Sequence, residues 1–195
     1  MSASAPFGPL PDTPPVLTGE RVRLRAPEPR DAEALFAIFA DAEFARYWST
    51  PPMTTIAEAH ELLARWQHHN EAHEGVQWVV ARRNDDRAIG TTTLFRFHPQ
   101  NRRAEIGYGL GREYWGKGLA SEALTLAIRY SFETLQVQRI EADIDPRNAA
   151  SERILVRQGF QVEGLLRERW IVGGEVSDSR LLGLLRREWT GGFGA

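Results

Sequence analysis

The stretch that decides the fold is a glycine-rich strand that runs through a second glycine-rich turn into a helix. It reads Glu105-Ile106-Gly107-Tyr108-Gly109-Leu110-Gly111-Arg112-Glu113-Tyr114-Trp115-Gly116-Lys117-Gly118-Leu119-Ala120. Glycine weakens a strand and usually marks a bulge or a close approach to the backbone. Gly116 and Gly118 precede a helix predicted over 118–132, and a helix N-terminus offers free N–H groups and the positive end of a dipole. The stretch predicts an anion site suited to a pyrophosphate, with a plain strand–turn–helix connection as the alternative.

Two other phosphate-binding motifs do not fit this stretch. A Walker A loop requires Ser or Thr directly after its lysine, whereas Lys117 is followed by Gly118. The dinucleotide fingerprint requires a third glycine, and Arg112 holds that position after Gly107 and Gly109. ATP-type and dinucleotide-type loops are therefore excluded.

The rest of the chain supplies further strands and helices around this centre. Asp31 is placed to cap the N-terminus of a helix, and Gly173-Gly174 is a hairpin turn signal. Strands are predicted at 21–24, 76–81, 89–97, 103–110, 139–144, 160–172 and 175–185, and helices at 31–39, 44–47, 55–69, 118–132 and 149–158. Without the short helical piece at 44–47, the order β-α-α-β-β-β-α-β-α-β-β predicts one α+β (mixed α/β) domain around a single sheet. We expect this domain at 17–189, between a disordered, proline-rich tail at 1–16 and a flexible tail at 190–195.

Composition limits the classes of function. The chain has 195 residues, a formal charge of -2 and no cysteine, so we expect no nucleic-acid partner, no thiolate chemistry and no disulfide. It holds no apolar run long enough to span a membrane and no basic leader before an apolar stretch, so we expect a cytoplasmic protein without a membrane partner. His69 and His73 are four residues apart, but no His-Glu-x-x-His pattern accompanies them, and we expect no metal.

The segment from Trp115 to Ala123 resembles the acetyl-CoA loop of the GNAT superfamily of N-acetyltransferases. The superfamily pattern, Gln/Arg-x-x-Gly-x-Gly/Ala, is met at Gly118 and Ala120. Trp115 departs from it at the Gln/Arg position, which is typical of the Rim-type branch, the N-terminal acetyltransferases of ribosomal proteins and their relatives. Further segments resemble the same branch, so that the resemblance covers about residues 16–189: the opening strand at 17–25, Asn148-Ala149-Ala150-Ser151, Gly159-Phe160 and the final hairpin at 167–179.

The resemblance implies a fold, a co-substrate and its binding residues. The fold would be a mostly antiparallel sheet with a parallel, splayed central strand pair, flanked by helices. The co-substrate would be acetyl-CoA, with Asn148 bonded to its pantetheine arm; a helix N-cap is the other role open to Asn148. Backbone groups of Trp115, Gly116, Lys117, Gly118, Leu119 and Ala120 would bind the pyrophosphate, and those of Gly107, Tyr108, Gly109 and Leu110 would pair with the pantetheine arm.

Acetyl transfer to an amine requires the amine to lose a proton and the departing thiolate to gain one. Ser151 is the candidate proton donor, because the Rim-type branch has a serine there; many GNAT enzymes instead use a tyrosine at the position of Leu155. An ordinary first-turn serine is the alternative. Glu105 is the candidate base, acting through water, because it alternates with Gly107 and Gly109 on one face of a strand; an exposed strand glutamate is the alternative.

The acceptor is left open by the sequence. Glu141, Asp143 and Asp145 could attract a cationic amine or simply form the wet face of a strand. The primary prediction is acetyl transfer from acetyl-CoA directly to a primary amine, such as a protein N-terminus. The alternatives are a small amine (polyamine, amino sugar or amino acid) and a non-catalytic acyl-CoA-binding module. The hairpin at 160–185 is a candidate homodimer contact.

Overall fold

The fold was analysed in a computed structural model that describes residues 9–191. Its centre is an eight-stranded sheet in the order β1-β2-β3-β4-β5-β6-β8-β7. All neighbouring strands are antiparallel except β5 and β6, which are parallel. The strands are β1 (Leu17–Thr18), β2 (Val22–Arg25), β3 (Gly75–Arg82), β4 (Ala88–His98), β5 (Arg103–Leu110), β6 (Arg139–Ile144), β7 (Gln161–Val172) and β8 (Glu175–Leu185).

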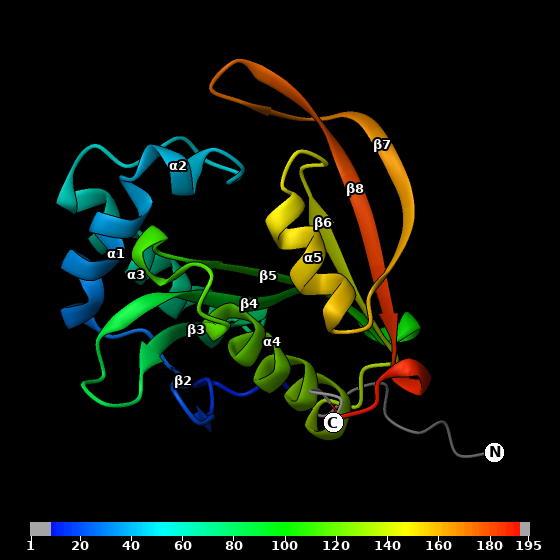
Figure 1. Cartoon of the computed structure of the whole chain (residues 1–195). Helices are drawn as coiled ribbons and strands as arrows, with labels where there is room; N and C mark the ends of the chain where they lie inside the picture. The colour runs from blue at the N-terminus through cyan, green and yellow to red at the C-terminus, as the bar shows by residue number, and fades with distance from the viewer. Residues whose placement is uncertain (1–8, 192–195) are drawn as a thin grey trace.

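Helices cover both faces of the sheet (Figure 1). On one face, three helices pack over β3 and β4 around a smaller core. On the other, two helices pack over the main core, and a π-helical turn at Tyr130–Thr134 extends the first of them. The helices are α1 (Ala32–Phe39), α2 (Ala42–Ala45), α3 (Ile56–Glu71), α4 (Leu119–Arg129) and α5 (Ala149–Arg157), and 3-10 turns lie at Pro29–Asp31, Pro99–Asn101, Arg112–Tyr114 and Arg186–Glu188. This arrangement confirms the predicted mixed α/β fold.

The central strand pair forms a fork. β5 and β6 pair only from Arg103–Arg139 to Glu105–Glu141, although β5 continues to Leu110. Beyond Glu105 the two strands diverge, and no strand of the described residues lies beside the edge of β5 on that side (Figure 1). The predicted splayed pair is therefore confirmed.

The segment before β1 lies against the domain. Leu10 packs against the main core, and the Pro15 carbonyl accepts a hydrogen bond of 2.9 Å from the indole Nε1 of the fully buried Trp78. Residues 1–8 and 192–195 lie outside the described part of the chain. The division into a domain with two tails stays a prediction.

The β7–β8 hairpin forms the outer end of the sheet. Within residues 9–191, β7 pairs with β8 alone, and it is exposed along most of its length. The hairpin carries several exposed apolar side chains, those of Val162, Leu165, Leu166, Ile171 and Val176. The homodimer contact predicted here stays a prediction.

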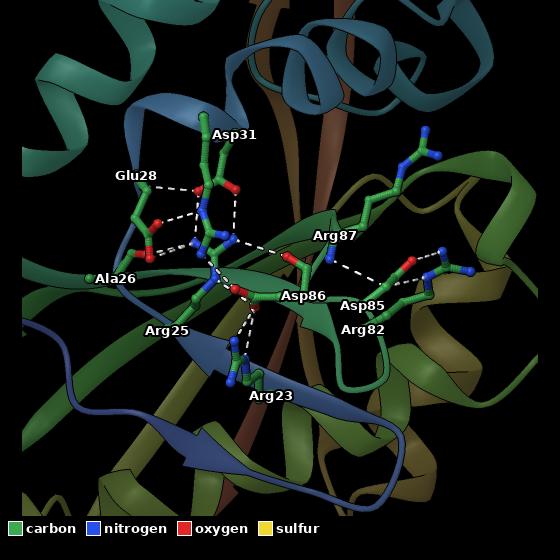
Figure 2. A network of polar contacts seen from close by, with 10 residues as sticks. Arg23, Arg25, Ala26, Glu28, Asp31, Arg82, Asp85, Asp86 and Arg87 are labelled. Atoms are coloured by element: carbon green, nitrogen blue, oxygen red, sulfur yellow. Dashed lines mark hydrogen bonds and ion pairs between the residues drawn. The ribbon is translucent and has the colours of Figure 1, made fainter.

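A buried charge network fixes the start of α1 (Figure 2). Arg25 donates to both carboxylate oxygens of Asp31, at 2.8 and 2.6 Å, and through Nε to Asp86 Oδ1 at 3.0 Å. Asp86 lies in the β3–β4 turn and also accepts from Arg23 and Arg30. Burial opposes ionisation of Asp86, but the guanidinium groups outweigh it and lower its pKa to about 2. The network therefore ties β2, the β3–β4 turn and the start of α1 together.

The prediction that the Asp31 side chain caps the helix is wrong. The helix does begin after Asp31, but no side-chain hydrogen bond from Asp31 caps it. The Asp31 carboxylate turns back instead to Arg25 and to the Glu28 N–H, 2.8 Å away. A buried guanidinium competes more strongly for a carboxylate than a helix N–H does.

Candidate active site

The turn into α4 is built from two glycines with left-handed backbone. Gly116 has φ 71° and Gly118 has φ 75°, a region that side chains with a Cβ rarely adopt. Gly118 occupies the N-cap and has no side chain, so no side-chain hydrogen bond caps α4. The first N–H groups of α4 therefore remain available to a ligand.

Trp115 ties this turn to the end of β5. Its indole Nε1 donates to the Leu110 carbonyl at 2.6 Å, while the side chain remains half exposed. The contact gives a structural reason for tryptophan at this position, because the indole fixes the distance between the end of the strand and the turn.

Gly109 of β5 allows two aromatic rings to lie close to the strand. A Cβ on Gly109 would lie 2.8 Å from the rings of Phe44 and Trp48, which belong to α2 and the segment after it. The close approach on this face of β5 therefore comes from the protein's own aromatic side chains, and a ligand would reach the strand along its open edge.

The opposite face of β5 carries Tyr108, which reaches α5. The Tyr108 hydroxyl lies 2.7 Å from Ser151 Oγ and 3.2 Å from the Ser151 carbonyl oxygen. Burial raises the pKa of Tyr108 to about 12, even though the hydrogen bond to Ser151 acts in the opposite direction. Tyr108 is therefore protonated at neutral pH. The sequence assigned only its backbone a role, and no local signal pointed to this pair.

Ser151 is placed by its own helix. Asn148 is the N-cap of α5, and its side-chain oxygen accepts from the Ser151 N–H at 3.1 Å. The capping role of Asn148 is confirmed, and its contact with pantetheine stays a prediction. Leu155, at the position where many GNAT enzymes have a tyrosine, is fully buried and carries no hydroxyl. The hydroxyl groups of Ser151 and Tyr108 lie together beside the fork.

Glu105 lies at the vertex of the fork and is paired. Its carboxylate accepts two hydrogen bonds from Arg96 Nη1, at 3.1 and 3.0 Å, and its side chain is 12% exposed. Arg96 sits at an irregularity of β4 with φ 50°. Glu105 is thus an arginine-paired carboxylate and not a plain exposed glutamate, and its role as the base stays a prediction.

The second acidic set is also paired with arginines throughout. Asp143 contacts Arg169 at 3.1 Å, and Asp145 contacts Arg147 at 2.6 Å. Glu141, level with Glu105 on the neighbouring strand, contacts Arg103 and Arg139. The carboxylates of this face are therefore neutralised within the protein.

These features match a known family of enzymes. Residues 21–161 match the acetyltransferase (GNAT) domain. The chain belongs to the GNAT family. It is 32% identical over 188 residues to the [ribosomal protein uS5]-alanine N-acetyltransferase of Escherichia coli, covering 90% of this chain and 93% of the relative. It is 29% identical over 154 residues to the spermidine N(1)-acetyltransferase of Escherichia coli, covering 79% and 80%. The solved structure of Mycobacterium smegmatis RimJ in complex with CoA-disulfide matches with a TM-score of 0.83 and 25% identity, covering 91% of this chain and 90% of that one.

This GNAT protein is an acetyl-CoA-dependent N-acetyltransferase of the Rim-type branch. Its residues fit the co-substrate at two places. The uncapped N-terminus of α4 suits a pyrophosphate, and the open edge of β5 suits an extended amide-containing arm. Acetyl-CoA supplies an acetyl group activated as a thioester.

A methyl group at Gly118 tests the loop. Gly118→Ala is expected to weaken acetyl-CoA binding by about tenfold, because left-handed backbone costs a non-glycine residue about 1–2 kcal/mol, and the Cβ would lie 3.3 Å from Arg21. Calorimetry with acetyl-CoA measures the effect. The control is Gly164→Ala, where a Cβ meets nothing within 4 Å. Equal affinities of the two variants would contradict the role of Gly118.

The described part of the chain shows neither a cluster of metal ligands nor a membrane-spanning helix. Within residues 9–191, no three side chains of His, Asp or Glu gather as metal ligands. No helix in this same range has the length and hydropathy needed to cross a membrane. The expectations of a metal-free enzyme and of a cytoplasmic location stay predictions.

Proposed function

We propose that this enzyme transfers the acetyl group of acetyl-CoA directly to the N-terminal amine of a protein or peptide. The observation that carries the proposal is the internal pairing of the carboxylates at the fork. A polyamine presents several ammonium groups, each of which is best bound by an unpaired carboxylate. Here Glu105, Asp143 and Asp145 each hold an arginine already. A peptide N-terminus brings a single ammonium group and needs no such acidic pocket.

We assign the proton transfers to the residues around the fork. Glu105 receives the proton of the amine through water, at the point where β5 and β6 part. Ser151 gives a proton to the departing sulfur and regains one from solvent, and Tyr108, 2.7 Å away, orients that hydroxyl. The absence of cysteine supports direct attack by the amine.

We assign co-substrate binding to backbone groups. The N–H groups between Trp115 and Ala120 bind the pyrophosphate, and the edge of β5 from Gly107 to Leu110 pairs with the pantetheine arm. The uncapped start of α4 and the unpaired edge of β5 support both assignments. Asn148 stands at the N-terminus of α5, close to Ser151 on the same side of the fork.

A thiol-release screen with acetyl-CoA tests the acceptor class. Peptides beginning with Ala, Ser or Met are compared with spermidine, an amino sugar and free amino acids. We expect kcat/KM for the best peptide to exceed that for spermidine by at least about tenfold, the equivalent of 1.4 kcal/mol. A preference for spermidine, as the name of one relative would suggest, would refute the peptide acceptor. Failure to bind acetyl-CoA in calorimetry would refute the enzyme activity itself.

A further inference from the structure

A buried carboxylate of α4 holds the turn between β1 and β2. The Glu122 side chain is 8% exposed. It accepts hydrogen bonds from the Arg21 N–H at 2.7 Å, from the Val22 N–H at 3.2 Å and from Arg21 Nε at 2.9 Å. Burial acts to raise the pKa of Glu122, but these donors outweigh it, and the pKa lies below its ordinary value. Glu122 is therefore an ionised anchor for Arg21.

The turn is packed closely against Glu122, so that a side chain at Gly19 would displace the carboxylate. A Cβ on Gly19 would lie 2.4 Å from Glu122 Oε1. The backbone before Arg21 is thus fixed by the same carboxylate that holds its guanidinium. Arg21 has little freedom to swing away, although 49% of its side chain is exposed.

The anchored guanidinium reaches the loop in front of α4. Arg21 Nη1 donates to the Lys117 carbonyl oxygen at 2.8 Å. Its Nη2 lies 3.3 Å from the position that a Cβ of Gly118 would occupy. Arg21 therefore bridges Glu122 in α4 and the peptide group between Lys117 and Gly118.

This contact fixes the direction of an N–H group. In a planar trans peptide the carbonyl and the following N–H point opposite ways. When Arg21 holds the Lys117 carbonyl, the Gly118 N–H is aimed away from Arg21, and the hydrogen bond polarises the peptide. The positive charge also remains within a few ångströms of the loop, where it favours an anion.

We propose that Arg21 is a positioning residue of the phosphate loop, which it holds in the anion-binding conformation through the Lys117–Gly118 peptide. The proposal rests on the proposed function only in taking CoA as the ligand. Arg21 acts through the loop backbone, so its loss reduces the affinity for the phosphate part of CoA and leaves the affinity for pantetheine unchanged.

Calorimetry with CoA and with pantetheine, which lacks the pyrophosphate, tests this division. We expect Arg21→Met to raise the Kd for CoA about tenfold, the equivalent of one lost charge-assisted hydrogen bond, and to leave the Kd for pantetheine within about twofold. Arg21→Lys keeps the charge on a compact ammonium group that lacks the planar fork reaching from Glu122 to the Lys117 carbonyl, so an intermediate Kd is expected. An equal loss for both ligands, or no loss for CoA, would overturn the proposal.

The matched control is Arg83→Met. Arg83 is an exposed arginine that donates to the Gly19 carbonyl at 3.1 Å on the same turn, and it has no hydrogen bond to the loop among the described residues. The variant removes an equal charge that contacts the β1–β2 turn from the β3–β4 turn, and we expect its Kd for CoA to stay within about twofold of the wild-type value. A tenfold loss of CoA affinity in this variant would show that Arg21 acts only through its charge, and it would overturn the positioning role.

Hydrogen exchange without ligand gives a second readout. In Arg21→Met the Glu122 amide, which donates to the Gly118 carbonyl at 3.1 Å, is expected to exchange about tenfold faster than in the wild type, while the amides of β8 exchange at the wild-type rate. Uniform acceleration would show global destabilisation and overturn the positioning role. This measurement requires no CoA, so it tests Arg21 even if the wild type failed to bind CoA, a result that would refute the proposed function instead.

Discussion

Ser151→Ala is expected to lower kcat by about a hundredfold, and Tyr108→Phe by about tenfold, with the KM for acetyl-CoA little changed. General acid–base catalysis by a positioned group contributes roughly 10²–10⁴ in rate. Ser151 would touch the reacting sulfur, whereas Tyr108 acts behind it through a 2.7 Å hydrogen bond. The measurement is steady-state thiol release with the best acceptor from the screen.

The control for this pair is Ser131→Ala. Ser131 is a fully buried serine in the π-helical turn after α4, and its Oγ donates to the Ala127 carbonyl of α4 at 2.7 Å. The Ser131→Ala variant also loses one serine hydroxyl but leaves the fork unchanged, so its kcat should equal that of the wild type. Because the pKa of Tyr108 is about 12, its ionisation should not limit activity between pH 6 and pH 10. Wild-type kcat in Ser151→Ala would exclude Ser151 as the proton donor.

Asp31→Ala is expected to reduce the free energy of unfolding by about 3–5 kcal/mol, because it leaves the buried charge of Arg25 without its main partner. The side chains of Arg25 and Asp31 are 5% and 3% exposed, so water cannot replace the lost contact. Urea denaturation measures the change. Asp85→Ala is the control. The side chains of Asp85 and Arg82 are 40% and 35% exposed, so their ion pair should contribute less than about 1 kcal/mol (Figure 2). Equal losses in the two variants would contradict the importance of burial.

The same network should make the free energy of unfolding depend on pH under acidic conditions. Asp86 has a folded-state pKa of about 2, below its ordinary value of 3.8. The unfolded state therefore binds the proton first, and the stabilisation is complete above about pH 4 and lost as the pH falls towards 2. The difference in unfolding free energy between the wild type and Asp86→Asn should shrink over this window. A constant difference would show that Asp86 does not titrate in the network.

Local patterns accounted for most of the fold. The alternation of Ile140, Ala142 and Ile144 predicted β6 with its observed bounds, because one buried face gives a strand its period of two. Gly116 and Gly118 predicted the turn into α4, because left-handed backbone favours glycine. Both signals lie within a few residues of the structure they specify.

The site depended on contacts that no local pattern contains. Tyr108 and Ser151 are 43 residues apart in sequence, and only the packing of α5 beside the fork brings their hydroxyls together. The pairing of Asp143 with Arg169 likewise depends on the hairpin lying beside β6. Asp31 was assigned as a cap because the partner that overrides this role, Arg25, is recognisable only once β2 is placed.

The fork gives this protein a second kind of strand edge. An edge on the outside of a sheet, such as that of β7, invites pairing with another molecule and carries a risk of aggregation. The open edge of β5 lies in the middle of the sheet, with β6 diverging beside it and β4 paired on its other side. Because this edge lies between two strands of the same sheet, the edge strand of another folded domain has less access to it than to the outer edge of β7. Unpaired backbone groups at this position therefore carry less risk of aggregation than the same groups would at the outside of the sheet.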